Sequence, residues 1–182
     1  MFNKPILINK KEDKYNTILF HPFKKKRIHG GLRIKNKFKR TNNIQPLLTI
    51  ITVVKNGAKT LEKCIKSVID QKGVNIEHII IDGCSSDSTI SILKKYSKNI
   101  DYWISEKDEG IYDGMNKGLQ LALGDYIGIL NSDDFYKKNS LKIIIKYFKK
   151  YKDIDFIFGT VFKGKILSGF WPHKIKWKFN VT

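Results

Sequence analysis

The sequence predicts an α/β fold in which a mostly parallel central sheet carries helices on both faces. Short apolar runs alternate with segments of helical periodicity from residue 46 onward. The connections between successive runs are too long for hairpins, so crossover helices are expected to join parallel strands. The first run, 47–54, is apolar and β-branched along almost its whole length, which is typical of a strand covered on both faces.

The elements can be assigned in chain order. The predicted strands are the apolar runs at 47–54, 76–81, 100–104, 126–130 and 156–161. The first helix is predicted from apolar residues that share one face, with lysines opposite: Leu61, Ile65, Val68 and Ile69. The same spacing predicts three later helices. The second carries Ile92, Leu93 and Tyr96 after a cap at Asp87 or Ser88, and the third is a short helix from about Met115 to Leu123. The fourth follows a cap at Asn139 or Ser140 and has Leu141, Ile144, Ile145 and Phe148 on its buried side.

The length of 182 residues fits one domain with a substantial core. No apolar run approaches the roughly 18–20 residues that a membrane-spanning helix needs, and the N-terminus lacks the apolar stretch of a secretion signal. We therefore expect a soluble or at most peripheral protein. Cys64 falls in a helical pattern and Cys84 in a turn, so we expect no disulfide and a cytoplasmic location.

Positive charge is concentrated near the N-terminus. Residues 1–45 contain 13 Lys and Arg and two acids, whereas 46–182 contain 22 and 15, so more than half of the net charge of +18 lies in a quarter of the chain. Residues 1–45 show no sustained period and are predicted to be a basic arm, flexible or draped over a core of 46–162. The arm could serve solubility, attract an anionic membrane surface or bind nucleic acid, and its few aromatic residues weaken the last alternative.

Polar residues gather where the predicted strands end. Lys55, Asn56 and Gly57 follow the first strand. The next three strands are followed by DGCSSDST at 82–89, SEKDEGIYDG at 105–114 and NSDD at 131–134. Because ligands of open parallel sheets bind beyond the carboxyl ends of the strands, this edge is the predicted site.

The adjacent carboxylates Asp133 and Asp134 are the main candidates for binding a cation. Two like charges side by side are stable in open solvent or beside a cation that both contact. At a strand end, a hard divalent ion held by one or two carboxylates could also bind phosphate oxygens. The alternative is that the pair caps the next helix, for which one residue would suffice. No metal-ligand spacing relates the four histidines, His21, His29, His78 and His173.

Two further segments could border a ligand. Asp82 precedes Gly83 and a small-residue turn, so its carboxylate could accept hydrogen bonds from a ribose or a base, unless the turn only caps a helix. Asp113 and Asn116 fall on one face of the following helix, unless the segment is a solvated acidic loop.

Four segments together resemble the successive blocks of the family 2 glycosyltransferases, which have the GT-A fold. They are LTIITVVKNGAKTLEKCIKSVIDQ, HIIIDGCSSDST, SEKDEGIYDGMNKGL and GDYIGILNSDDFY. The resemblance spans residues 47–161. It implies a Rossmann-like nucleotide-diphospho-sugar transferase that moves a sugar with inversion at the anomeric carbon.

The resemblance also implies roles for individual residues. It places Asp82 near the nucleoside, Asp133 near the ribose or diphosphate, and Asp134 on Mg²⁺ or Mn²⁺. The loop with Asp113 and Asn116 would border the donor, which is expected to be a UDP-sugar. The acceptor would be a glycan or lipid-linked molecule of cell-surface polysaccharide synthesis. The remaining donor-binding positions that it implies are Thr52, Val54, Lys55, Asn56 and Ser132.

The sequence departs from that family in two places. Members usually carry the catalytic base in an acidic block beyond the fifth strand, but no acid follows Asp155 here. Residues 163–182 are therefore expected to begin an incomplete acceptor-side region, in a fragment that binds donor and transfers weakly. Asp155 begins the predicted fifth strand and is a poor candidate for the base, whereas His173 is a candidate that nothing else in the sequence supports. Lys55 stands where many members have an aromatic residue that can stack on the base. A lysine cannot stack in the same way, but it could contact the diphosphate instead.

Two other classes of function stay open. A nucleotidyltransferase would share the ion and the nucleotide, but it would be expected to have a glycine-rich loop after the first strand, and KNGAKT contains one glycine. A non-catalytic basic module could bind membranes or nucleic acid and keep only a vestigial nucleotide site. Its binding would depend steeply on salt and would not respond to Asp134→Ala.

Overall fold

The computed structural model describes residues 23, 26–42, 44–151, 157, 161–163 and 166–168. Their helices and strands are β1 (Ile28–Gly30), the 3-10 helix η1 (Arg33–Lys35), β2 (Leu47–Val54), α1 (Leu61–Ile69), β3 (Asn75–Asp82), α2 (Thr89–Lys95), β4 (Tyr102–Ser105), α3 (Ile111–Leu121), β5 (Tyr126–Ile129), α4 (Ser140–Lys150), β6 (Val161–Lys163) and β7 (Ile166–Ser168).

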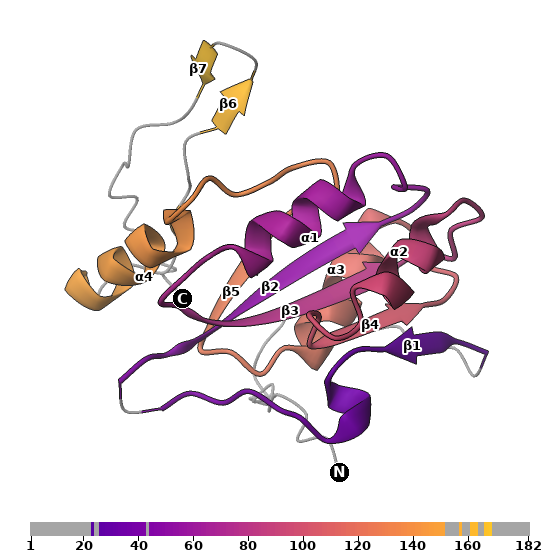
Figure 1. Ribbon diagram of the computed structural model, residues 1–182, viewed down its shortest axis with the longest axis horizontal. Coiled ribbons are helices and arrows are strands. Elements are labelled where there is room, and N and C mark those ends of the chain that lie inside the picture. Colours follow the sequence, from indigo (N-terminus) through magenta and orange to yellow (C-terminus); the bar gives the residue numbers. More distant parts are fainter. Residues whose placement is uncertain are drawn as a thin grey trace, which may run out of the picture.

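Five strands form one sheet in the order β1-β4-β3-β2-β5. The neighbours among β2, β3, β4 and β5 pair in parallel, and β1 pairs with β4 in the antiparallel sense. The arrows of β2, β3 and β4 accordingly point the same way in Figure 1. The predicted α/β fold with a mostly parallel sheet is confirmed, and β2 has the bounds that the apolar run 47–54 predicted.

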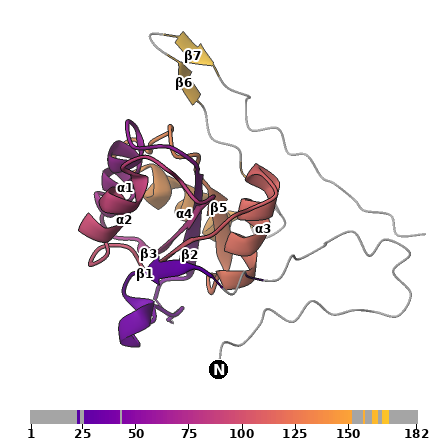
Figure 2. The same ribbon diagram turned by 90° about the vertical axis from the view of Figure 1, so that its right-hand side faces the viewer.

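Helices cover both faces of this sheet. α1 and α2 lie on one face and α3 lies on the other (Figure 2). α4 shares the face of α1, because Leu141 belongs to the same buried cluster as Cys64 and Val68. Each face of the sheet therefore has its own apolar layer, as the unbroken apolar run of β2 requires.

α3 lies close to β2 because two glycines occupy its contact face. A Cβ atom at Gly114 would lie 2.6 Å from Cγ1 of Val53, and one at Gly118 would overlap the side chain of Ile51. The two glycines are four residues apart and so fall on the same side of the helix. This close packing fixes the position of the N-terminus of α3, which lies at the carboxyl edge of the sheet.

Residues 26–42, which belong to the predicted basic arm, pack on the core. β1 extends the sheet beyond β4, and η1 buries Arg33, whose guanidinium contacts Glu77. Lys39 Nζ lies 2.9 Å from Oδ2 of Asp101. A three-residue strand is too short to show a period in the sequence, which is why it was missed. Residues 1–22 lie outside the described part of the chain.

The bounds of the later elements also differ from the prediction. α3 begins at Ile111 rather than at residue 115, and β4 at Tyr102 rather than at residue 100. β5 is covered on one side only, since Ile127 and Ile129 are 41% and 49% exposed in the described structure. The predicted strand at 156–161 falls mainly outside the described residues. Within the described ranges, no helix is both long and apolar enough to cross a bilayer.

Candidate functional site

The ends of β2, β4 and β5 surround a pocket of about 880 Å³ at the carboxyl edge of the sheet. Three segments line it: 53–57 together with Thr60, 108–111, and 131–133. The edge predicted from the polar strand ends is therefore the edge that carries a pocket. The predicted site residues that line it are Val54, Lys55, Asn56, Ser132 and Asp133.

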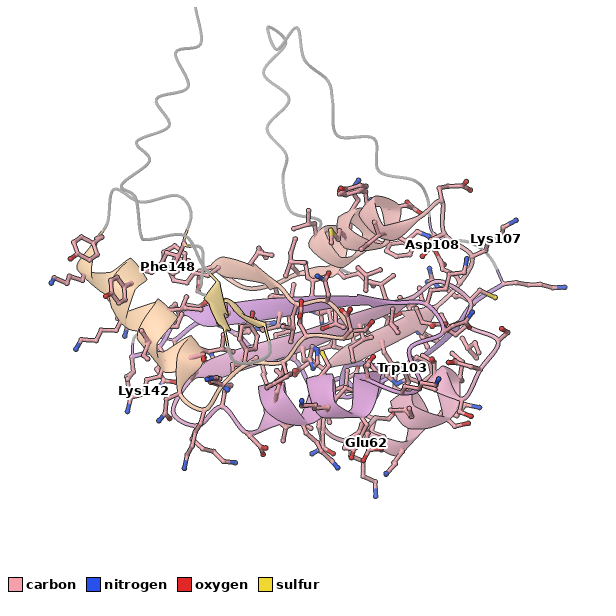
Figure 3. The ribbon with its side chains drawn as sticks, turned by 90° about the horizontal axis from the view of Figure 1, so that it is seen from above. Glu62, Trp103, Lys107, Asp108, Lys142 and Phe148 are labelled. Atoms are coloured by element: carbon pink, nitrogen blue, oxygen red, sulfur yellow. The ribbon has the colours of Figure 1, made fainter. Side chains whose placement is uncertain are left out.

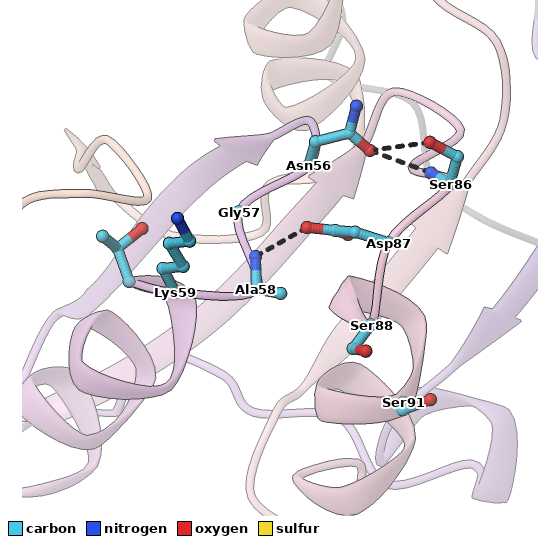
Figure 4. A pocket seen from close by; sticks show the side chains of 9 residues that line it. Asn56, Gly57, Ala58, Lys59, Ser86, Asp87, Ser88 and Ser91 are labelled. Carbon is cyan, nitrogen blue, oxygen red and sulfur yellow. Dashed lines mark hydrogen bonds between the residues drawn. The ribbon is translucent and has the colours of Figure 1, made fainter.

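Reciprocal hydrogen bonds fasten the ends of β2 and β3 to each other. Asn56 has a φ of 53°, in the left-handed region that asparagine tolerates better than most residues. Its backbone N–H donates to Ser85 Oγ at 2.7 Å, and its Oδ1 accepts from Ser86 N at 2.9 Å. Oδ2 of Asp87 accepts from Ala58 N at 3.0 Å (Figure 4). These bonds fix the turn that follows β2.

A second pocket of about 780 Å³ adjoins this turn. It is lined by residues 56–60, 86–88 and Ser91, so Asn56, Gly57 and Thr60 border both pockets. Figure 4 shows that its polar side chains come from the segments that follow β2 and β3. The turn after β2 is therefore the wall between the two pockets.

α1 holds the loop that carries the adjacent acids. Cys64 Sγ donates to the carbonyl oxygen of Asn131 at 3.6 Å, and Ser67 Oγ accepts from Tyr136 N at 3.1 Å. Burial raises the pKa of the Cys64 thiol to about 11, and the charges of Asp134 and Asp133 act in the same direction. The thiol is therefore protonated at neutral pH and is available as a hydrogen-bond donor.

Asp133 and Asp134 are both exposed but differ in position. Asp133 lines the pocket. Asp134 lies beside it in a turn, where its N–H donates to Asn131 O at 3.1 Å and its Oδ2 accepts from Asn131 Nδ2 at 3.3 Å. No group of three His, Cys, Asp or Glu suited to a metal ion occurs among the described residues. Two adjacent carboxylates still fit a hard cation that takes its other ligands from phosphates and water.

Three of the predicted donor-binding residues, Asp82, Thr52 and Asp113, are buried and do not line either pocket. The carboxylate of Asp82 accepts hydrogen bonds from Ser85 N at 3.0 Å, from Ser85 Oγ and from Ser105 Oγ at 2.5 Å. Thr52 Oγ1 lies 3.0 Å from Nε2 of His78. The side chains of Asp82 and Thr52 therefore bind protein groups and connect neighbouring strands.

The segment before α3 brings acids to the pocket that were not assigned a role from the sequence. Asp108 and Glu109 line the pocket, whereas Asp113 and Asn116 do not. Asp113 is buried, and its Oδ2 accepts from Glu109 N at 3.0 Å. The sequence shows these acids as one cluster, and only the helix start at Ile111 determines which of them point outward.

Comparison of the sequence with known families and proteins gives a consistent result. The sequence model of the family described as Glycosyl transferase family 2 matches residues 49–181. Over 103 residues the chain is 38% identical to a protein of Bacillus subtilis (strain 168) provisionally named the teichuronic acid biosynthesis glycosyltransferase TuaG, covering 55% of this chain and 41% of that protein. It is 29% identical over 120 residues to a PGL/p-HBAD biosynthesis glycosyltransferase of Mycobacterium bovis (strain BCG / Pasteur 1173P2), covering 64% and 47%. The matched residues span less than half of either relative.

Two solved structures share the fold. One is S. aureus TarS 1-349 in complex with UDP-GlcNAc, with a TM-score of 0.53 and 23% identity over 58% of this chain and 32% of that one. The other is the mannosyltransferase PcManGT from Pyrobaculum calidifontis in complex with GDP-Man and Mn²⁺, with a TM-score of 0.54 and 20% identity over 64% and 37%. At these identities the likeness shows the fold alone.

Proposed function

Because this chain belongs to glycosyl transferase family 2, we propose that its pocket between β2, β4 and β5 binds a nucleotide-diphosphate sugar for transfer with inversion. The pocket itself is the observation that carries this proposal. It places a lysine and the first of two adjacent carboxylates at the carboxyl ends of parallel strands, where such ligands bind. The UDP-GlcNAc and GDP-Man bound to proteins of the same fold support this class of donor.

Asp134 and Asp133 are the residues that would hold a Mg²⁺ or Mn²⁺ ion. When bound, such an ion supplies positive charge that stabilises the departing diphosphate. The chain's own contribution is to hold the loop that carries both carboxylates: Cys64 Sγ donates to the carbonyl oxygen of Asn131, and Asn131 Nδ2 donates to Oδ2 of Asp134. Lys55, which lines the same pocket from the end of β2, adds a second positive charge for the diphosphate.

The proposed acceptor is a glycan or a lipid-linked molecule of cell-surface polysaccharide synthesis, in line with the biosynthetic names of the similar proteins. Its hydroxyl must lose a proton to a positioned base. Asp155 and His173, which were considered for this role, lie outside the described residues. No residue of the described structure is assigned as that base.

Calorimetric titration with UDP-sugars tests the donor site. We expect binding to strengthen by at least about tenfold when Mn²⁺ is added, because Asp133 and Asp134 would hold a divalent ion whose charge offsets that of the diphosphate. In Asp134→Ala this gain should be lost, and affinity should be the same with and without Mn²⁺. GDP-sugars titrated under the same conditions determine which nucleotide is preferred.

Asp70→Ala provides the matched control for that titration. Asp70 is also an exposed aspartate, but it caps the far end of α1 and lines neither pocket. The control variant should keep the full response to Mn²⁺. A wild-type chain that binds every sugar nucleotide equally well without a metal, or an Asp134→Ala variant that behaves like Asp70→Ala, would contradict the assignment of Asp134.

The excess of positive charge suggests where this chemistry takes place. We propose that the chain, with a net charge of +18, associates peripherally with the anionic cytoplasmic face of a membrane, where lipid-linked acceptors occur. It should co-sediment with phosphatidylglycerol vesicles at low salt and be released by about 1 M salt, which shortens the Debye length to about 3 Å. Equal binding to neutral phosphatidylcholine vesicles would disprove an electrostatic association, and a preference for RNA over vesicles would favour the nucleic-acid alternative.

A further inference from the structure

We infer that Lys117 is a positioning residue, which holds the segment 106–110 against the pocket so that Asp108 and Glu109 face the ligand. The effect of Lys117 on donor affinity rests on the proposed function, whereas its effect on the segment does not. The segment 106–110 is called the acidic loop below.

Lys117 is buried in α3, with 1% of its side chain exposed. Its Nζ lies 2.8 Å from Oε1 of Glu106 and 3.1 Å from Oδ2 of Asp113, and it donates to the carbonyl oxygen of Lys107 at 3.4 Å. Two of these three partners, Glu106 and Lys107, belong to the acidic loop. The third partner, Asp113, accepts a hydrogen bond from Glu109 N at 3.0 Å. The ammonium group of Lys117 therefore holds the beginning of the loop directly and, through Asp113, also holds the loop near its end.

The acidic loop forms one wall of the pocket. Asp108, Glu109 and Gly110 line the pocket together with Ile111, whereas Lys117 does not reach it. The carboxylate of Asp108 lies over the end of β3, so close that a Cβ atom at Gly83 would be 2.5 Å from its Oδ2. In Figure 3, Lys107 and Asp108 lie at the opposite end of the molecule from Lys142 and Phe148 of α4. The loop is thus fixed at the carboxyl edge of the sheet, where the pocket is.

The charges explain why this position needs a cation. Glu106 and Asp113 are both buried, and two carboxylates in the same interior region would repel each other without a positive charge between them. Burial acts to lower the pKa of Lys117, but the contacts with Glu106 and Asp113 outweigh it and raise the pKa above its ordinary value. Lys117 therefore keeps its charge at neutral pH, and the loop conformation depends on that charge.

Hydrogen exchange measured by mass spectrometry on Lys117→Met tests the inference directly. Methionine has a similar length but carries no charge. We expect amide exchange in peptides covering 106–110 to accelerate by about tenfold, because Asp113 and Glu106 lose their shared partner. Exchange in β3 of the same sample should stay near that of the wild type. The dissociation constant of the UDP-sugar with Mn²⁺ should rise by about tenfold, or 1.4 kcal/mol.

Lys66→Met is the matched control, because Lys66 also pairs with an acid four residues away on a helix, Glu62 at 2.8 Å, but lies outside both pockets. It should change neither exchange at 106–110 nor donor affinity. Lys117→Gln, whose amide can still donate to one carboxylate, should give an intermediate effect and serves if the methionine variant is too unstable.

The possible outcomes separate the two parts of the inference. Equal acceleration in β3 and in 106–110 in both Lys117 variants would show that Lys117 stabilises the whole fold, and the positioning role would be wrong. Faster exchange at 106–110 with unchanged donor affinity would also overturn it. If the wild type binds no sugar nucleotide, the proposed function fails, and the exchange result alone decides whether Lys117 positions the loop.

Discussion

Replacing Glu77 by alanine will destabilise the folded protein by about 3–5 kcal/mol, because it leaves a buried guanidinium without its counter-charge. The side chains of Arg33 and Glu77 are 2% and 0% exposed, and the two groups are in direct contact. Oε2 of Glu77 also accepts from Thr49 Oγ1 at 2.7 Å and from Leu123 N at 3.0 Å. The carboxylate therefore joins the N-terminal segment, β2 and the end of α3, and its loss affects all three.

Urea denaturation of the wild type and variants measures this loss. Arg33→Met should be destabilised to a similar extent, because it leaves the carboxylate unpaired. The double variant Arg33→Met, Glu77→Leu should recover much of the stability, since it buries no lone charge. Glu62→Ala is the control: Glu62 pairs with Lys66 and Lys95 on the surface, and surface pairs contribute little. A loss for Glu77→Ala no larger than the loss for Glu62→Ala would show that the buried pair does not hold these elements together.

The Arg33–Glu77 pair also shows what the sequence could not predict. Residues 1–45 contain 13 basic residues, and nothing in their spacing separates Arg33 from the rest. Its role depends on Glu77, 44 positions away, which lies in an apolar run that predicts a strand but not a buried acid. Pairs of this kind are set by tertiary structure, so the spacing of the basic residues does not predict which of them is buried.

The parts that were predicted correctly follow from local physics. A strand buried on both faces must be apolar at successive positions, so β2 could be located residue by residue. The parallel order then required the polar strand ends to meet at one edge, and Lys55, Ser132 and Asp133 do meet at one pocket. The resemblance of the four sequence blocks predicted the family, and the match of the family model over residues 49–181 confirms it.

The sequence could not predict the direction in which a polar side chain points. Asp82 and Asp133 both follow apolar strands, yet Asp82 is buried among serine donors and Asp133 faces the pocket. Lys117 was one polar residue among several in an acidic segment, although it is almost fully buried. A carboxylate at a strand end can bind a ligand or accept hydrogen bonds from a neighbouring loop. Which of the two it does depends on whether hydrogen-bond donors of the protein lie close enough to it.

Stability will fall by about 2 kcal/mol between pH 7 and pH 5 through the titration of His78 alone. The side chain is 2% exposed, and its Nε2 lies 3.0 Å from Thr52 Oγ1. Burial, with a smaller contribution from the charge of Lys39, lowers the pKa of His78 from 6.5 to about 3 in the folded protein. Folded His78 is therefore neutral throughout this range.

The sign of the effect follows from the two protonation states. Below pH 6.5 the unfolded chain binds a proton at His78 that the folded chain cannot accept until pH falls to about 3. The unfolded state therefore binds more protons across this window, and the free energy of unfolding decreases as pH falls, by up to about 1.4 kcal/mol per pH unit. The contribution is complete above pH 6.5 and is lost progressively towards pH 3.

Urea denaturation at pH 7, 6 and 5, a range above most carboxylate titrations, isolates this histidine. His78→Gln keeps a polar group beside Thr52 but cannot take up a proton, so its stability should vary with pH by about 2 kcal/mol less than that of the wild type over the same range. His29→Gln is the matched control, because His29 is an exposed histidine within the edge strand β1, where its Nδ1 lies 2.9 Å from Tyr102 Oη. If the stability of His78→Gln depends on pH as steeply as that of the wild type, burial of His78 does not oppose its protonation, and other groups cause the pH dependence.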